Sequence, residues 1–218
     1  MEFIYECEDA FPVSFCNRVI EKFEKSDLKF KGIAGSVLST AKKSTDVRIY
    51  DEPEWVEEEK YFHVMIRKAM KNYETFLLKM DVDDEVKKEM SQFLTNTHIY
   101  PPQIQRTEPG QYYHWHHDQT YPPCWKLFTY IIYLNDVEKD SGGTTEFSCG
   151  KIIQPKTGKI VIFPSTWTYY HRGKTLQKGV KYIATNALII KPVREISISR
   201  RQVEEQSKPV LPFIISRD

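Results

Sequence analysis

The sequence predicts a mainly β protein in which N-terminal helices pack on an antiparallel β core. Up to about residue 95, apolar residues recur at three- and four-residue steps, which is typical of helices. From about Thr97 the apolar segments become short and rich in β-branched and aromatic residues, which favours strands. Turn signals such as SGG at 141–143 and KTG at 156–158 separate these segments. Several short strands at this spacing indicate a sandwich or a barrel.

Helical periodicity is clearest in two N-terminal stretches. In residues 11–24, Phe15, Val19 and Phe23 fall on one face, and Pro12 suits the start of a helix. The second stretch is longer and begins near Asp51 and Pro53. An aspartate can cap a helix, and a proline is tolerated in its first turn. A shorter helix is expected after it. The predicted helices span residues 11–24, about 51–80 and 82–93.

The second half of the chain predicts strands that alternate with turns. Each segment is short and bounded by glycine, proline or aspartate. An antiparallel sheet of this kind buries one face, so the helices are expected to cover it. Strands are predicted at residues 98–100, 104–108, 128–134, 144–147, 159–163 and 182–190.

Composition predicts an ordinary globular protein of 218 residues. Of its residues 40% are apolar and 28% charged, and the net charge of +1 favours neither nucleic acid nor a membrane surface as partner. The four cysteines show no metal-ligand spacing. No secretory leader or apolar run of about 18 residues is recognisable. These features predict a cytoplasmic protein with reduced thiols and no membrane partner.

The segment GQYYHWHHD at 110–118 carries the first chemical signal. His116 and Asp118 stand two residues apart, so in a strand they would reach one metal from the same side. His171 is the candidate third ligand. Two histidines and one carboxylate leave positions open on Fe(II) for a co-substrate and O₂, which a closed zinc site lacks. His114 and His117 also stand in the motif; we favour His116 because only it keeps the His-x-Asp spacing.

Lys181 is the second chemical signal, ten residues after His171 and at the start of the apolar strand YIATNALII. A lysine at the start of an inward-facing strand costs free energy unless it meets an anion. The far carboxylate of a dicarboxylate that chelates the metal would supply one. The neighbouring strands offer neutral hydrogen-bond donors for the same pocket, namely Thr129, Tyr133 and Thr145.

From about residue 96 to 190 the sequence resembles the catalytic domain of the prolyl 4-hydroxylase-like 2-oxoglutarate/Fe(II) dioxygenases. The family signature runs Gly-x-x-Tyr-x-x-His-x-Asp, a strand ending near Asn-Asp, Gly-Gly-x-Thr, Phe-Pro, and a histidine with a basic residue ten positions later. Each piece is common, but the ordered combination is specific. The matching residues are Gly110, Tyr113, His116, Asp118, Asn135, Asp136, Gly142, Gly143, Thr145, Phe163, Pro164, His171 and Lys181.

This resemblance implies a double-stranded β-helix, or jelly roll, braced by helices. It implies that Fe(II) is bound by His116, Asp118 and His171, and that Lys181 anchors 2-oxoglutarate. Fe(II), 2-oxoglutarate and O₂ are the expected cofactor and co-substrates, with ascorbate as a candidate addition. 2-Oxoglutarate would be decarboxylated to succinate as a substrate is hydroxylated. By the same resemblance, the further residues of the co-substrate pocket are Tyr133, Thr145 and Tyr113.

The substrate is the least constrained part of the prediction. Proline in a peptide or protein is the favoured target, and an aromatic groove near the metal would hold it. The same chemistry on a free amino acid, another small molecule or a nucleic acid base is the alternative, although the charge disfavours nucleic acid. The loop at residues 117–125 is expected to cover the substrate. The candidate substrate residues are Tyr121, Trp125, Trp167 and Asn186.

Two other classes of protein share parts of this pattern. A non-catalytic module that kept the fold would have no need of an intact His116, Asp118, His171 and Lys181. A cupin-like zinc or manganese protein would leave Lys181 unexplained. A dioxygenase is therefore the favoured interpretation, as a monomer or homodimer.

One domain with three parts is expected from these patterns. Residues 1–95 form a helical support region within it, and residues 96–190 form the Fe(II)/2-oxoglutarate dioxygenase core. Residues 191–218 are polar and interrupted by prolines, but end in an apolar cluster. They predict a C-terminal arm or tail.

Overall fold

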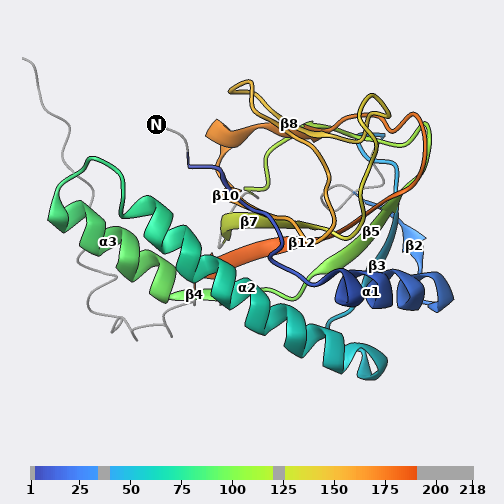
Figure 1. Ribbon diagram of the computed structural model, residues 1–218, viewed down its shortest axis with the longest axis horizontal. Coiled ribbons are helices and arrows are strands. Elements are labelled where there is room, and N and C mark those ends of the chain that lie inside the picture. The colour runs from blue at the N-terminus through green and yellow to red at the C-terminus, as the bar shows by residue number, and fades with distance from the viewer. Residues whose placement is uncertain (1–2, 34–39, 120–125, 191–218) are drawn as a thin grey trace, which may run out of the picture.

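Two antiparallel sheets lie opposite one another, and three helices lie along the outer side of the larger sheet (Figure 1). The computed structural model describes residues 3–33, 40–119 and 126–190 of the chain. The predicted substrate residues Tyr121 and Trp125 and the C-terminal arm lie outside these ranges.

The larger sheet has eight strands and forms the base of the molecule. Its central strand β12 pairs with β7 on one side and with both β5 and β4 on the other. In the order of the sheet the strands are β1 (Tyr5–Cys7), β10 (Ile160–Pro164), β7 (Lys126–Tyr133), β12 (Lys181–Ile190), β5 (Gln103–Thr107), β3 (Thr45–Arg48) and β2 (Phe30–Lys31), with β4 (Thr97–Ile99) beside β12.

The smaller sheet has four short strands and covers the inner side of the larger one. Its strands, in order, are β6 (Tyr113–His116), β11 (His171–Gly173), β8 (Thr145–Phe147) and β9 (Ile152–Ile153). The arrangement is the predicted jelly-roll type, without a closed barrel.

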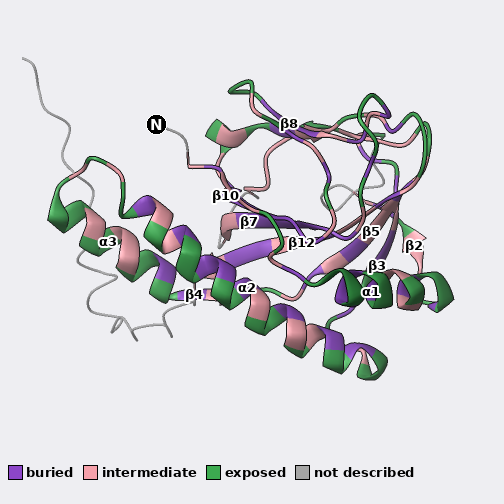
Figure 2. Ribbon diagram, viewed as in Figure 1, coloured by how far each residue is buried: buried purple, intermediate pink, exposed green. Residues whose placement is uncertain are grey.

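The helices α1 (Val13–Lys25), α2 (Val56–Leu77) and α3 (Asp84–Thr95) form at the predicted places. A short 3₁₀ turn, η1 (Pro53–Trp55), precedes α2, so the proline stands where its missing N–H matters least. The side of α2 that faces the sheet is buried and its other side is exposed (Figure 2). No helix in the described ranges is long and apolar enough to cross a membrane.

Two hydrophobic cores lie on opposite faces of the larger sheet. The larger core joins α1 and α2 to the outer face and includes Phe62, Ile66 and Tyr73. The smaller core fills part of the space between the sheets and includes Tyr133, Phe147 and Phe163. The inner face of the larger sheet is therefore apolar mainly at β10 and β7.

All six predicted strands are present, with bounds shifted by one or two residues. The predicted strands do not include β1, β2, β3, β6, β9 and β11, which have two to four residues each. Segments this short carry little periodicity, and they become strands because a neighbouring strand supplies their hydrogen bonds.

Candidate functional site

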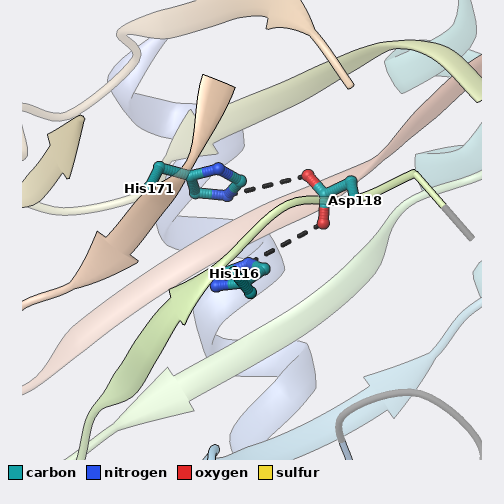
Figure 3. A group of neighbouring side chains, drawn as sticks. All are labelled: His116, Asp118 and His171. Atoms are coloured by element: carbon teal, nitrogen blue, oxygen red, sulfur yellow. Dashed lines mark ion pairs between the residues drawn. The ribbon is translucent and has the colours of Figure 1, made fainter. Parts of the chain in front are cut away.

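His116, Asp118 and His171 come together between the two sheets, as Figure 3 shows. Asp118 Oδ1 lies 3.7 Å from His116 Nε2, and Asp118 Oδ2 lies 3.6 Å from His171 Nε2. The candidate ligand atoms all lie within 4.8 Å of one another. Within the described ranges, no other cluster of histidine, cysteine and carboxylate ligands of this kind occurs. One metal ion can therefore be reached by two imidazoles and one carboxylate.

A bulge in β6 selects which histidine faces this centre. β6 and β11 pair at His116 with His171 and again at Tyr113 with Gly173, so three steps on β6 match two on β11. The extra residue turns Tyr113 and His116 to the same side, where their rings stack with centroids 3.5 Å apart. His114 is exposed instead and stacks on Tyr112.

Asp118 does not lie in the strand, contrary to the expectation that His116 and Asp118 share one. β6 ends at His116, and the backbone N–H of Gln119 donates to Ser165 O on the other sheet. The chain thus crosses from the smaller sheet toward the larger one at this point, and the carboxylate approaches the imidazole through that turn. His117, the other histidine in the motif, packs on the Tyr170 ring.

Hydrogen bonds fix the orientation of all three candidate ligands. His116 Nδ1 lies 2.7 Å from His114 O, and His171 Nδ1 lies 3.1 Å from Tyr169 O. Each Nδ1–H can therefore donate to a carbonyl, which directs the lone pair of Nε2 to the centre. Thr129 Oγ1 donates to Asp118 Oδ2 over 2.6 Å.

Electrostatics favours the protonation states that a metal needs. Burial and the neighbouring His171 lower the pKa of His116 to about 4, so its imidazole is neutral at pH 7. Burial alone would raise the pKa of Asp118, but the two histidines and the Thr129 hydrogen bond outweigh it and hold that pKa below its usual value. The cluster thus holds a neutral imidazole at His116 beside an ionised carboxylate at Asp118.

Lys181 lies in the same chamber, buried at the start of β12. Its side chain is 5% exposed, and Nζ donates to Gly143 O over 2.8 Å. Burial lowers its pKa to about 8. No carboxylate among the described residues pairs with it. The backbone also leaves room there, since a Cβ added at Gly173 would lie 3.7 Å from Nζ. A buried cation without a counter-charge is costly unless a ligand supplies an anion.

The three predicted neutral donors, Thr129, Tyr133 and Thr145, lie in two different parts of the site. Tyr133 Oη donates to Thr145 Oγ1 over 2.7 Å, and burial raises the pKa of Tyr133. Thr145 lines the chamber, with Tyr133 behind it. Thr129 instead contacts Asp118 and Ser165. Tyr113 lines the chamber beside His116, and burial raises its pKa as well.

The chamber has a volume of about 230 Å³, and both sheets contribute to its walls. Asn186, a predicted substrate residue, is part of the lining. Trp167, another, is 65% exposed and is not among the lining residues.

The strand β5 was predicted, but β3 was not, and neither was the wall that the two form along the chamber. Gln103 and Gln105 of β5 line the chamber, and so do Lys42 and Ser44, which precede β3. A signal for β3 exists in the sequence, because Val47 and Ile49 alternate with the polar residues of TDVRIY.

A buried ion pair forms part of this wall. Asp46, with 0% exposure, accepts hydrogen bonds from Lys42 Nζ at 2.7 Å, Ser44 Oγ at 2.7 Å and Gln103 Nε2 at 2.6 Å. Lys42 Nζ also lies 5.4 Å from the centre of the Tyr113 ring, which stacks on His116. The ion pair is thus linked through one ring to a candidate metal ligand.

Comparison with known proteins agrees with this geometry. Residues 102–188 match the family model described as the 2OG-Fe(II) oxygenase superfamily. Those residues include the whole His116, Asp118, His171 and Lys181 set. This stretch of the chain therefore resembles the 2OG-Fe(II) oxygenases. Together with the His-Asp-His cluster, the match supports an oxidoreductase that uses Fe(II), 2-oxoglutarate and O₂. A search of curated proteins finds no match.

Solved structures of prolyl hydroxylases share the fold of this chain. A viral collagen prolyl hydroxylase from Paramecium bursaria Chlorella virus-1, in complex with 2-oxoglutarate, is 19% identical, with a TM-score of 0.59 over 86% of this chain and 96% of that one. A Pseudomonas putida prolyl-4-hydroxylase is 12% identical, with a TM-score of 0.63 over 88% and 95%. A Trichoplax adhaerens prolyl hydroxylase, in complex with a hypoxia inducible factor peptide fragment, is 15% identical, with a TM-score of 0.66 over 87% and 84%.

Proposed function

We propose that this oxygenase hydroxylates proline in a peptide or protein and converts 2-oxoglutarate to succinate. One observation carries the proposal: a three-ligand cluster and a buried lysine without a carboxylate partner share one chamber. The cluster suits Fe(II), which binds two histidines and a carboxylate and keeps positions open. The lysine suits the far carboxylate of 2-oxoglutarate.

In this proposal, His116, Asp118 and His171 hold Fe(II). The metal supplies the site at which 2-oxoglutarate and O₂ react when both are bound. The protein's part is to keep the His116 imidazole neutral and to orient both imidazoles through their Nδ1 hydrogen bonds. Thr129 engages Asp118 Oδ2, which steadies the carboxylate and leaves Oδ1 toward His116.

Lys181 is proposed to pair with the far carboxylate of 2-oxoglutarate. A charge-assisted hydrogen bond of this kind contributes about 2–3 kcal/mol to binding. Thr145 lines the same chamber and Tyr133 donates to its hydroxyl, so the Thr145 proton is free for the same carboxylate. Tyr113 borders the chamber next to His116 and limits the space around the metal.

A peptide substrate is supported by the polar side of the chamber. Gln103, Gln105 and Asn186 line it, and amide side chains can both donate to and accept from a peptide backbone. Among the structures that share the fold, the Trichoplax enzyme was solved with a peptide fragment. Asn186 remains a proposed substrate residue on this basis.

The division of the chain is also a proposal. Residues 96–190 would form the catalytic core, and residues 1–95 would support it within the same domain. Contacts between the two parts favour one domain, because β1, β2 and β3 belong to the larger sheet and α2 packs on it.

The metal and co-substrate assignments can be tested under anaerobic conditions. Fe(II) and 2-oxoglutarate together should give a weak charge-transfer band near about 500 nm, which requires open metal positions. His171→Ala should abolish the band, and Lys181→Ala should require roughly 30- to 150-fold more 2-oxoglutarate to reach it. His63→Ala, an exposed histidine on α2, is the matched control. Metal binding without any band would contradict the co-substrate assignment.

The substrate class needs a separate measurement. Proline-containing peptides, the same peptides with alanine in place of proline, and free proline are offered in turn, with succinate and hydroxyproline measured by mass spectrometry. Hydroxyproline from the proline peptides alone is the expected result. Succinate that rises only with free proline would replace the peptide by a small molecule.

A further inference from the structure

The chamber is lined by an excess of positive charge. Among its described lining residues, Asp118 is the one carboxylate, and it belongs to the candidate metal cluster. Against it stand five lysines that line the chamber: Lys42, Lys43, Lys126, Lys174 and Lys181. The chain's net charge of +1 gives no hint of this concentration.

Neighbouring carboxylates neutralise only part of this charge. Asp46 pairs with Lys42 at 2.7 Å, while Glu146 pairs with both Lys174 at 3.3 Å and Arg172 at 2.6 Å. With Lys126 left aside, five cations meet three carboxylates among the described residues, counting Arg172, Asp46 and Glu146 with the lining residues, which leaves an excess of two positive charges. Fe(II) and the 2-oxoglutarate dianion cancel one another, so the excess persists in the loaded enzyme.

Two exposed cations mark the two ends of the β3 wall. Lys43, just before β3, lies over the Tyr112 ring, with Nζ 5.4 Å from its centre. Arg48, the last residue of β3, lies over the Phe30 ring at 5.1 Å. Neither has a carboxylate partner among the described residues. Arg48 stands five positions after Lys43, a span of roughly 16 Å along an extended chain.

The space between these cations suits an extended peptide. Arg48 lines a groove that shares Gln103 and Asn186 with the chamber, so the two hollows adjoin. The shared residues are neutral amides, which can bind backbone groups between charged ends. A nucleic acid would need a longer series of cations along its phosphates.

We propose that the substrate is an acidic peptide, in which Asp or Glu residues flank the target and pair with Lys43 on one side and Arg48 on the other. This inference rests on the proposed peptidyl hydroxylation. The aromatic rings beneath both cations hold each charged group over a flat surface at the edge of the chamber. Complementary charge would raise the association rate and favour acidic over neutral sequences.

The test uses three twelve-residue peptides that differ only in charge. Each has one central proline in a host of alanine, serine and glycine, with Glu, Gln or Lys placed two or three residues to either side. We measure kcat/KM for hydroxyproline formation with the full-length enzyme, and Kd by fluorescence anisotropy with Mn(II) and 2-oxoglutarate. The Glu peptide is expected to exceed the Gln peptide about tenfold, since each exposed pair contributes up to roughly fivefold. Salt at about 1 M should remove most of this preference.

Charge reversal identifies the residues responsible. Lys43→Glu and Arg48→Glu should each reduce the preference for the Glu peptide severalfold, and together they should favour the Lys peptide. Lys88→Glu is the matched control, because it makes the same change at an exposed position on α3. The affinity for 2-oxoglutarate should stay unchanged in all three, which shows that the chamber is intact.

The failure of this inference is distinct from that of the proposed function. Equal hydroxylation of the Glu, Gln and Lys peptides would overturn the acidic preference and leave peptidyl hydroxylation standing. A preference that survives in the double variant would overturn the roles of Lys43 and Arg48. No hydroxyproline from any peptide, with displacement of the Glu peptide by a single-stranded oligonucleotide, would overturn both proposals.

Discussion

Two adjacent rows of residues cross the larger sheet and face opposite ways. The outer row has 0% exposure throughout and consists of Val47, Ile104, Ala184, Ile132 and Ile160. One residue further along the same strands, the inner row consists of Asp46, Gln105, Ile183 and Tyr133. Because successive side chains point to opposite faces, one step along the chain separates the helix-covered core from the chamber.

The outer and inner rows contribute differently to stability and to function. The outer row is apolar and contributes through burial, which is not directional. The inner row includes the carboxylate of an ion pair at Asp46, the amide of Gln105 and the phenol of Tyr133. The free energy that each contributes depends on the geometry of its hydrogen bonds and on its partner. Changes on the outer face should therefore alter stability, whereas changes on the inner face should alter chemistry, and stability only where they leave a buried charge unpaired.

The largest effect is expected at Asp118, where the inner side carries the chemistry. Asp118→Asn should lower 2-oxoglutarate turnover roughly 1000-fold, or about 4 kcal/mol, because the metal loses its one anionic ligand. The melting temperature of the metal-free protein should change little, which calorimetry can measure. Asp140→Asn makes the same change in an exposed turn with φ of 66°, which asparagine tolerates, and should leave both quantities unaltered. Turnover within tenfold of the wild type in Asp118→Asn would contradict the ligand assignment.

The outer face should show the reverse behaviour. Phe62 of α2 is fully buried and its ring packs on Phe15 with centroids 4.9 Å apart. Phe62→Ala should lower the free energy of unfolding by about 3–5 kcal/mol, measured by urea denaturation. The affinity for 2-oxoglutarate should remain at the wild-type value wherever the variant is folded. Phe93→Ala, on a side chain that is 55% exposed, should change stability by less than about 0.5 kcal/mol.

Sequence patterns anticipated the outer face better than the inner one. Helical spacing marks Phe15, Phe23 and Phe62, and the long strands of the second half carry clear apolar runs. The ordered motif likewise identified His116 and Lys181 from the sequence alone. Periodicity is the signal in the first case, and fixed spacing around reactive groups in the second.

Other inner-face features have no local signature. The turn of His114 away from the centre depends on a bulge in β6 that is visible only in its pairing with β11. Likewise, nothing near Asp46 in the sequence shows that Gln103, 57 residues away, donates to it. These contacts are products of sheet register, which a single strand does not encode.

The Lys42–Asp46 pair tests whether the inner face also contributes to stability. Asp46→Asn or Lys42→Met alone leaves one charge buried, and should destabilise the fold by about 3–5 kcal/mol. The double variant should lose less stability than the two single variants lose together, because no unpaired charge remains. A double-mutant cycle from urea denaturation measures the coupling. Additive losses would show that the two side chains act independently despite their 2.7 Å contact.

Replacement of Lys181 should give the smallest change in the free energy of unfolding, and this change should depend on pH. Its pKa of about 8 in the folded protein lies below the usual 10.5, because burial disfavours the charged form. Below about pH 8 the lysine is protonated in both states, and the folded state bears the whole penalty, up to about 3 kcal/mol. Between about pH 8 and 10.5 the unfolded chain binds more protons, so the free energy of unfolding rises with pH.

Lys181→Met lacks this charge and should therefore be more stable than the wild type at pH 7, with a gap that narrows as the pH approaches about 10. Urea denaturation of both metal-free proteins at several pH values measures the gap. Fe(II) and 2-oxoglutarate should close or reverse it at pH 7, because the proposed carboxylate partner then stabilises the lysine. Lys88→Met, at an exposed position, should show no such gap. A gap that does not vary with pH would mean that Lys181 does not titrate in this range. The burial of its charge would then not be the cause of the difference in stability between the two proteins.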